Sequence, residues 1–466
     1  MRKLKAFLSA VLITTATFAA TACSSKDSSS STDIIMDEEK RTKLFEIAEN
    51  EDLLKGEIEN KKIKWLSNWD INPDVNSGKY TPPDLALFKE IYGGEIEYIA
   101  CTKSDLLYDK LAKSISSGEG VDFFYGGNLD AFPRGALNDN SWFVPADDYI
   151  DFDSVLWKDV KAANDELLWG GKHYLAITQV TGSNVACIYN RKTMQEAGLD
   201  DPADLYRKGK WDWDAFEGML EKFVGSDSNH YGIDGWWFEF GLINTIGVPA
   251  VGIEDGKLKS NVGDPAMERV QNWMYDLYQK GYVAVGEASG WNVFPQHIGE
   301  GSLLFYPVGL YELYYKPEQW KATYGEDAFF VPMPKDPKAD AQYIPVGMEA
   351  YAFVNGGQNP EGVAKFLDCK RFVLINKEAR SIADSTFIDD YGWTQEMLDM
   401  KDEMDRIAEE DPVFDLSKGV SKDCGELLDT ELRKTTRGVP WNETYESIAP
   451  VVEKYIEDIN NSISDQ

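Results

Sequence analysis

The hydrophobic pattern of residues 60–130 predicts strands that alternate with helices. Apolar and polar positions alternate in Ile63-Lys-Trp-Leu-Ser-Asn-Trp, which is typical of a strand. Pro82 and Pro83 favour the first turn of a helix, and the glycine pair at 93–94 ends it. In chain order, the expected elements are strand 63–69, helix 82–92, strand 95–101, helix 104–117 and strand 121–125. This order and spacing predict a parallel sheet with helices on its faces.

Two longer extended runs follow this part of the chain. The run 175–190, LAITQVTGSNVACIYN, is longer than an average strand and has no helix break, so we interpret it as a segment that passes from one lobe to another. The run 343–353, YIPVGMEAYAF, is interpreted as a second crossing. Further strands are expected at 302–308 and 328–333, and helices at 37–58, 191–198, 212–224, 264–281 and through most of 360–466.

The N-terminal segment has the layout of a targeting signal. A basic start precedes the apolar run 6–20, which is too short to span a bilayer comfortably, and small residues precede Cys23. We predict a signal peptide over 1–22. The cysteine directly after it resembles the lipobox of bacterial lipoproteins, which predicts lipidation of Cys23, although Ala20 stands where lipoboxes usually carry leucine. The alternative is a plain signal peptide followed by a chance cysteine.

The segment after Cys23 predicts that the folded part of the protein is held at a distance from the membrane. Serines dominate 24–32 and favour a flexible tether, and the charged helix expected at 37–58 carries only a thin apolar stripe. We interpret 23–59 as a lipid-anchored tether and spacer helix. No later stretch is apolar enough to cross a bilayer, so membrane contact is expected through the anchor alone.

Charge and cysteine content exclude several classes of partner. The formal net charge of -33 repels nucleic acid and anionic lipid headgroups, so neither is expected as a partner. The cysteines at 101, 187, 369 and 424 are too widely spaced for a zinc site or a disulfide scaffold. One or two bridges are compatible with their number, but isolated buried thiols are favoured.

The sequence gives little support for catalysis. It contains no nucleophile elbow, zincin helix or phosphate-binding loop, and His173, His230 and His297 lack the spacing of metal ligands. We therefore expect no cofactor, no metal and no enzyme activity. A glycosidase needs only two carboxylates, which 80 acidic residues cannot exclude, so a secreted carbohydrate-active enzyme stays the alternative.

A series of motifs in a fixed order resembles a known family. The motifs are GVDFFYG at 120–126, GKHY at 171–174, IYNRK at 188–192, AGL at 197–199, WDWDAF at 211–216, GEGSLLF at 299–305, FVPMP at 330–334, Gly347 and NPEGVAKFL at 359–367. Each motif is weak alone, but together they span roughly 60–460 and resemble the extracellular solute-binding proteins of ABC importers, in particular the large sugar-binding family that includes maltodextrin binders. Val121 stands where the family has proline, and Trp213 is offset from the family's tryptophan.

The resemblance implies the fold, the partners and the mechanism. The family fold is an α/β, two-lobed, type II periplasmic-binding-protein-like structure with a ligand cleft at the hinge between two α/β domains. Lobe 1 would comprise 60–177 with 347–395, and lobe 2 would comprise 181–342 with 396–466. A monomer on the extracellular face of the bacterial cell membrane would close on a carbohydrate, expected to be an oligosaccharide, and deliver it to ABC transporter permease subunits. Another solute such as a peptide, or a role in sensing rather than transport, stays open.

The first candidate ligand residues follow the predicted parallel strands. Sugars present apolar C–H faces and a rim of hydroxyls, so their sites need aromatic platforms and planar hydrogen-bonding groups. Trp69 and Asp70 follow the first strand, and Asn128 and Asp130 follow the third, at the carboxyl ends where a ligand crevice opens. Alternatively, Trp69 covers the sheet edge, Asp70 caps a turn, and the loop at 126–130 is a plain turn.

The first crossing adds a polar face. Gln179 and Thr181, with Ser183, share one side of an extended segment by two-residue alternation, which indicates either a cleft wall or a hydrogen-bonded hinge. In the second crossing, Glu349 follows Gly347. Its carboxylate could accept sugar hydroxyls or form a hinge salt bridge.

The second lobe carries adjacent tryptophans in GIDGWWFEFG, residues 232–241. Extended backbone would send them to opposite sides, so we predict that Trp236 packs in the core and Trp237 offers its ring to a sugar, with Glu239 on the same side. Trp291 and Tyr311, the latter two residues after Gly309, are further aromatic candidates. Trp393 and Trp441 lie in helical surroundings and are interpreted as packing residues.

Overall fold

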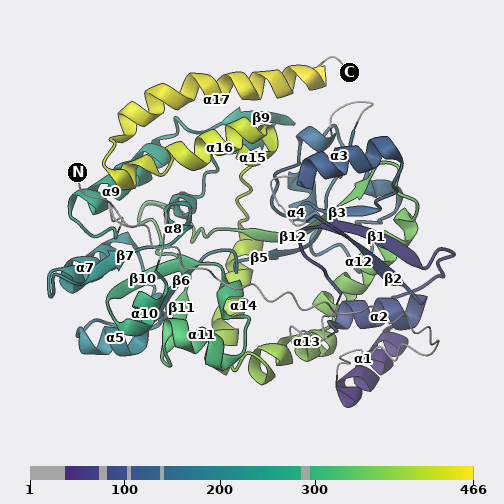
Figure 1. Cartoon of the computed structure of the whole chain (residues 1–466), viewed down its shortest axis with the longest axis horizontal. Helices are drawn as coiled ribbons and strands as arrows, with labels where there is room; N and C mark the ends of the chain where they lie inside the picture. Colours follow the sequence, from purple (N-terminus) through teal and green to yellow (C-terminus); the bar gives the residue numbers. More distant parts are fainter. Residues whose placement is uncertain (1–36, 73–80, 102–106, 137–140, 285–293, 465–466) are drawn as a thin grey trace, which may run out of the picture.

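The computed structural model describes residues 37–72, 81–101, 107–136, 141–284 and 294–464. Figure 1 shows two α/β lobes side by side. One is built around the N-terminal segments in purple and blue, and the other around the middle of the chain in teal. Within the described residues the strands form a six-stranded sheet, a four-stranded sheet and a two-stranded hairpin. The α/β two-lobed fold class expected from the sequence is confirmed.

Lobe 1 is built on the six-stranded sheet. Its strands run in the order β2-β1-β3-β12-β4, and β5 also pairs with β12. β1 pairs in parallel with β2 and β3, as the sequence predicted, whereas β12 runs antiparallel to β3, β4 and β5. The strands are β1 (Lys62–Ser67), β2 (Glu95–Ala100), β3 (Phe123–Tyr125), β4 (Phe143–Val144), β5 (Ala176–Thr181) and β12 (Gly347–Val354).

The helices of lobe 1 bury aromatic and aliphatic side chains against this sheet. The ring of Phe88 in α2 contacts that of Phe366 in α12 at an interplanar angle of 60°, with centroids 5.4 Å apart, and Leu87 is fully buried. Gly93 ends α2 in the left-handed conformation, which glycine adopts without strain. The helices are α2 (Pro83–Tyr92), α3 (Leu107–Ser117), α4 (Lys161–Glu166), α12 (Pro360–Ile375) and α13 (Lys377–Asp389).

The charged N-terminal helix is part of lobe 1, not a separate spacer. This helix, α1 (Glu38–Glu51), packs against α2 and α13. Leu44 is fully buried, and Lys40 Nζ binds Ser385 Oγ at 2.8 Å and Asp389 Oδ2 at 2.7 Å. A helix was predicted at 37–58, and the structure confirms it as far as Glu51. Its thin apolar stripe is enough to dock it on the lobe.

Lobe 2 is built on the four-stranded sheet, in the order β11-β6-β10-β7. β10 is antiparallel to β6 and parallel to β7. Its strands are β6 (Ala186–Asn190), β7 (Tyr231–Ile233), β10 (Leu303–Val308) and β11 (Ala328–Val331), with the hairpin β8 (Val251–Glu254) and β9 (Lys257–Ser260) beside them. The helices of this region are α5 (Arg191–Glu196), α6 (Pro202–Arg207), α7 (Trp213–Val224), α8 (Phe238–Ile243), α9 (Pro265–Gln279), α10 (Gln296–Glu300) and α11 (Pro317–Tyr324).

The C-terminal helices follow a third connection between the lobes. In Figure 1, α14 (Gln395–Glu410) runs between the lobes, and α16 (Lys422–Glu431) and α17 (Trp441–Ser464) lie along lobe 2. The short α15 (Ser417–Val420) joins α14 to α16. The buried carboxylate of Asp405 in α14 accepts hydrogen bonds from Thr181 Oγ1 at 2.6 Å, Gly182 N at 2.9 Å and Lys401 Nζ at 2.9 Å. α14 is thus fastened directly to the first crossing.

The extended run 175–190 is two strands rather than one. β5 belongs to the lobe 1 sheet and β6 to the lobe 2 sheet, so the chain crosses at 182–185. A Cβ on Gly182 would lie 2.4 Å from the carbonyl oxygen of Met404, so only glycine fits at this point of the crossing. The second extended run likewise leads from β11 in lobe 2 to β12 in lobe 1. The residue boundaries assigned to the lobes from the sequence stay a prediction.

The cysteines are buried in both lobes. Cys187, Cys369 and Cys424 are buried free thiols, and Cys101 is buried as well. Burial raises the pKa of Cys424 to about 12 and that of Cys187 well above its usual range, so both thiols stay protonated. In the described part of the chain, no helix has the length and apolarity needed to span a membrane.

Candidate functional site

A cavity of about 290 Å³ lies where loops of both lobes meet the crossings. This volume is at the lower end of the range of small-molecule sites. Lobe 1 contributes the loop after β3, and lobe 2 contributes the segment around α8. The lining residues come from 125 and 127–129, from the crossings at 184–185 and 345–348, from 237, 240, 243–244 and 248–250, and from 413–415, 417–418, 425, 428–429 and 432.

The lobe 1 wall is the loop after β3. Tyr125 lines the cavity and its hydroxyl donates to the carbonyl oxygen of Met348 at 2.9 Å. A Cβ on Gly127 would lie 2.2 Å from that same oxygen, which explains the glycine. Leu129, also in the lining, has a φ of 53°, a conformation that branched and bulky residues rarely adopt. The loop is therefore held in one defined shape.

Of the four ligand residues predicted for lobe 1, one lines the cavity and three do not. Asn128 is exposed and lines the cavity. Trp69 is 38% exposed and meets Tyr125 edge-on at 5.0 Å, so it stands beside the cavity without lining it. Asp70 accepts from the backbone N–H of Asn72 at 2.9 Å and caps a turn, the alternative considered for it. Tyr108 hydrogen-bonds to the Asp130 carboxylate, which lies behind the loop.

Burial and neighbouring groups act on the pKa of Asp130 in opposite directions. Burial raises the pKa of its carboxyl, while the hydrogen bond from Tyr108 and the charge of Lys418 oppose that rise. Asp130 is absent from the cavity lining, so the structure gives it a supporting position rather than a ligand-facing one.

For the tryptophan pair, the prediction failed at Trp236, whereas Trp237 lies at the cavity. Trp236 is 43% exposed, so its assignment to the core was wrong. Trp237 is half-buried and lines the cavity, where we expected it to face a ligand. The reason for the error is local: the pair lies in a turn that leads into α8 at Phe238, and two-residue alternation does not apply there.

Glu239 does not face a ligand. It lies in the first turn of α8 and is fully buried. Its Oε1 accepts from Arg437 Nη1 at 2.9 Å and Thr436 Oγ1 at 3.0 Å, and its Oε2 lies 3.7 Å from Arg433 Nη1. The prediction of Glu239 as a ligand residue was wrong, because a carboxylate in the core needs cationic partners and those come from the C-terminal segment.

The same arginine supports the aromatic wall. The Arg433 guanidinium carbon lies 5.8 Å from the ring centroid of Trp237 and 4.7 Å from that of Phe240. Its Nη1 donates to the backbone carbonyl of Trp236 at 2.8 Å. Glu239 therefore acts on the site indirectly, by holding the cation that packs on Trp237.

Tyr311 lies next to Trp237. It is 49% exposed at the start of η6 (Leu310–Leu313), and a Cβ on Gly309 would lie 2.3 Å from its ring. Burial raises the pKa of the Tyr311 hydroxyl, and a hydrogen bond with Trp237 opposes the rise. Tyr311 extends the aromatic surface outward from the cavity but is not among the residues that line it.

The candidate ligand residues on the two crossings form contacts within the hinge. Thr181 donates to Asp405 and accepts from the backbone N–H of Ser183 at 3.1 Å. Gln179 pairs with Glu349 across β5 and β12, and Glu349 Oε2 accepts from Tyr351 at 2.7 Å and lies 3.8 Å from Lys370 Nζ. None of these side chains lines the cavity, so the structure favours the hinge alternatives.

Four remaining assignments complete the comparison with the sequence. Trp291 and Cys23 lie outside the described residues. Trp393 and Trp441 are 3% and 4% exposed, which confirms them as packing residues. Within the residues that the structure describes, no group of three or more side chains could hold a metal ion.

Sequence reasoning missed most of the polar lining. Asn184 and Asn244 reach the cavity from the first crossing and from the end of α8, and Asp415, Lys418 and Asp429 reach it from the C-terminal segment. A polar residue inside a predicted crossing could have pointed to Asn184. The C-terminal group carries no local signal, because its pattern is that of ordinary amphipathic helices.

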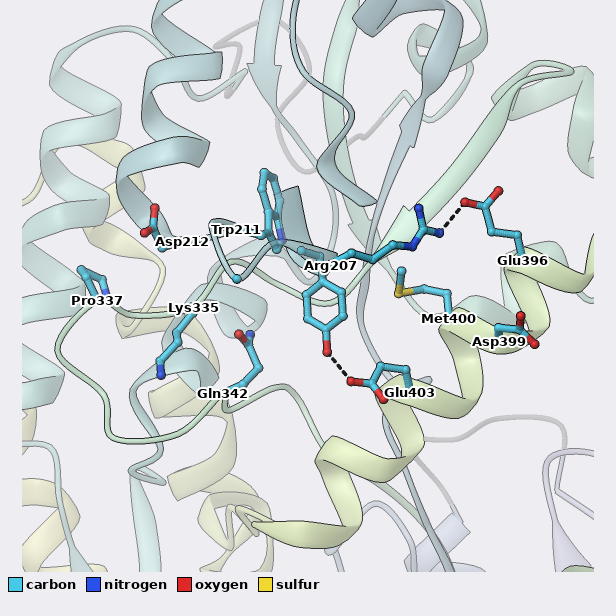
Figure 2. A pocket seen from close by; sticks show the side chains of 12 residues that line it. Arg207, Trp211, Asp212, Lys335, Pro337, Gln342, Glu396, Asp399, Met400 and Glu403 are labelled. Atoms are coloured by element: carbon cyan, nitrogen blue, oxygen red, sulfur yellow. Dashed lines mark hydrogen bonds and ion pairs between the residues drawn. The ribbon is translucent and has the colours of Figure 1, made fainter. Parts of the chain in front are cut away.

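A second cavity of about 780 Å³ lies outside this site, between α6, the segment 335–342 and α14. Figure 2 shows two interactions between its lining side chains: Tyr206 donates to Glu403 at 2.7 Å, and Arg207 binds Glu396. Hydrogen bonds from Arg191 and Arg207 lower the pKa of Glu396 to about 2. No residue of the β1 or β3 loops lines this cavity, so it is not the place where the lobes meet.

Comparisons with known proteins agree with this geometry. The family model of bacterial extracellular solute-binding proteins matches residues 72–369. A search of curated proteins gave no match. A cyclo/maltodextrin-binding protein complexed with maltotetraose superposes with a TM-score of 0.59 at 16% identity, covering 86% of this chain and 99% of its own.

Two further structures show the same fold with different ligands. The GacH receptor of Streptomyces glaucescens, solved without ligand and with acarbose, superposes with a TM-score of 0.60 at 13% identity, covering 85% of this chain and 98% of its own. UgpB from Mycobacterium tuberculosis in complex with glycerophosphocholine gives 0.56 at 16% identity, covering 87% of this chain and 99% of its own. At these identities the similarity establishes the fold, not the ligand.

Proposed function

The chain belongs to the bacterial extracellular solute-binding proteins, and we propose that it captures an oligosaccharide by closure of its two lobes and delivers it to the permease of an ABC transporter. The observation that carries this proposal is the cavity lined from both lobes and from the crossings between them. A ligand that contacts both lobes binds the closed state better than the open state, and so shifts the population toward closure.

The lining has the chemistry of a carbohydrate site. Trp237 and Tyr125 offer aromatic faces for the C–H surface of a sugar ring. Asn128, Asn184 and Asn244 each carry a donor and an acceptor that match hydroxyl groups. The maltotetraose and acarbose complexes of similar fold support the same ligand class, whereas the glycerophosphocholine complex marks a non-sugar solute as the competing one.

The proposal extends to location. Proteins of this family act outside the cytoplasm, and we include lipidation at Cys23 after removal of 1–22 as the means of attachment to the membrane. A membrane-bound binder delivers ligand to a permease in the same membrane without diffusing away. Mass spectrometry of the native protein would detect the acyl chains on the N-terminal cysteine, and a free or absent Cys23 would contradict the anchor.

The ligand class is tested by thermal shift and calorimetry on the purified protein. The panel contains maltotetraose, a galactobiose, glycerophosphocholine, a tripeptide and free amino acids. A ligand at about 100 times its Kd stabilises the folded state by about 2.7 kcal/mol, which a melting curve resolves. Stabilisation by oligosaccharides that are recovered intact supports the proposal. Stabilisation only by peptides or glycerophosphocholine would refute the sugar assignment, and hydrolysis of the sugar would establish the enzyme alternative.

A further inference from the structure

Three charged side chains line the described part of the interlobe cavity: Asp415, Lys418 and Asp429. Asp415 is fully engaged by the protein, because its Oδ2 accepts from Ala250 N at 2.6 Å and its Oδ1 from Ser417 N at 2.8 Å. Asp429 forms an ion pair with Arg433 Nη2 at 3.1 Å. The two carboxylates in the lining are thus already bonded within the protein.

Lys418 differs from both. Its side chain is exposed, and no ion pair to it is found among the described residues. Its ammonium lies over Trp237, 5.7 Å from the ring centroid, which is within cation–π range. The charge of Lys418 acts on the Asp130 carboxylate, but that carboxylate receives a hydrogen bond from Tyr108, and no ion pair joins it to Lys418 among the described residues.

The backbone at Lys418 is fixed although the side chain is not. α15 is a single short turn, and the next residue, Gly419, lies so close to the loop of lobe 1 that a Cβ would be 1.6 Å from the carbonyl oxygen of Phe132. The backbone of Lys418 is therefore held at the cavity wall, and a neutral sugar stacked on Trp237 shares that ring with the ammonium above it. A sugar that carries an anion instead supplies the partner that the ammonium lacks.

From this geometry we infer that the ligand is an acidic saccharide, and that Lys418 is the specificity-determining residue that binds its anionic group. The inference rests on the proposed function and narrows its substrate class. Carboxylate and phosphate ester share the chemistry that an ammonium recognises, and the two are separated by the probes below. The protein's overall negative charge does not oppose this contact, because it is screened over about 8 Å at physiological salt, whereas a contact inside the cavity is not.

Matched sugar pairs test the inference by isothermal titration calorimetry. The pairs are α-1,4-galactobiose against α-1,4-digalacturonate, and trehalose against trehalose 6-phosphate. The acidic member of at least one pair should bind the wild type about tenfold or more tightly than the neutral member, as expected for a hydrogen bond to a charged group. Lys418→Met should remove that preference by weakening the binding of the acidic member.

The control is Lys335→Met, which changes a lysine of the second cavity instead (Figure 2). It should leave every affinity as in the wild type. Lys418 is exposed and Lys335 is half-buried, and an unchanged melting temperature establishes that each variant is folded. If Lys335→Met, and not Lys418→Met, removes acid binding, the anion binds at the second cavity and the inference is wrong.

The remaining outcomes separate this inference from the proposed function. Equal binding of neutral and acidic members, or an acid preference that survives Lys418→Met, overturns the inference and leaves an oligosaccharide binder. Binding of no saccharide of either kind overturns both.

Discussion

Gly419 lies at a contact between the C-terminal segment and lobe 1, and its replacement by alanine should hold the lobes apart. A Cβ at this position would lie 1.6 Å from the carbonyl oxygen of Phe132 and 2.6 Å from that of Leu129. Real Cβ atoms do not approach within 3.0 Å of another heavy atom, so the two backbones would have to separate by more than an ångström. Neither backbone can rotate out of the way as a side chain would.

The cost falls on the arrangement of the lobes that the structure describes, in which the two backbones touch. Overpacking of this kind costs about 1–3 kcal/mol. Separation of the lobes relieves it, because α15 packs on α16 and α17, whereas Leu129 and Phe132 follow β3 of the other lobe. When the lobes are apart, the added methyl group meets no backbone of lobe 1 and the overpacking is absent. A ligand that binds by closure should therefore lose about 5- to 150-fold in affinity, while the melting temperature of the ligand-free protein changes little.

Calorimetry and small-angle X-ray scattering check this expectation. Ligand should reduce the radius of gyration of the wild type and reduce it less in Gly419→Ala. Gly218→Ala is the matched control, because a Cβ at this helical position in α7 would meet nothing within 4 Å. The control should bind and close as the wild type does. A Gly419→Ala variant that closes fully and keeps its affinity would refute the assignment of this contact to closure.

Three further predictions address the site and its support. Trp237→Ala should weaken ligand binding by about 30-fold, as for the loss of an anchoring aromatic worth about 2 kcal/mol, whereas Trp236→Ala should bind normally in calorimetry; equal losses in both would contradict the placement of Trp237. Glu239→Ala should lower the free energy of unfolding in urea by about 3–5 kcal/mol, because it removes the buried carboxylate that Arg433 and Arg437 share, and a loss below 1 kcal/mol would rule out that role. Glu396 has its pKa lowered to about 2 from 4.5, so its stabilising effect should be complete above pH 4.5 and be lost as the pH falls toward 2; Glu396→Gln should abolish that part of the acid transition, and an unchanged transition would contradict it.

Local rules recovered the fold because its signals are local. The strands at 62–67 and 95–100 and the helix at 83–92 follow from alternation, from proline at a helix start and from glycine at its end. The run 175–190 was predicted as one extended segment, since nothing in the sequence shows that Gly182 lies against the backbone of Met404, more than two hundred residues away. Sheet membership depends on that distant packing.

The site residues were harder to predict for the same reason. Asn128 follows a strand end, and that placement alone leads to the cavity. Glu239 was misplaced because its partners, Arg433 and Arg437, lie almost two hundred residues further along the chain. The role of Lys418 could not be predicted from the sequence, because a lysine in an amphipathic segment is normally a solvated residue. Only its contact with Trp237 distinguishes it.

Ligand recognition and lobe closure meet at two adjacent residues of α15. The side chain of Lys418 lies over Trp237 in the cavity, and the backbone of Gly419 lies against the loop of lobe 1. A ligand that fixes the Lys418 side chain therefore acts on the short turn that also forms the contact between the lobes. Because binding and closure share that turn, the two substitutions should not be additive. Lys418→Met should reduce the affinity for an acidic sugar by a smaller factor in the Gly419→Ala background than in the wild type, and equal factors in both backgrounds would separate recognition from closure.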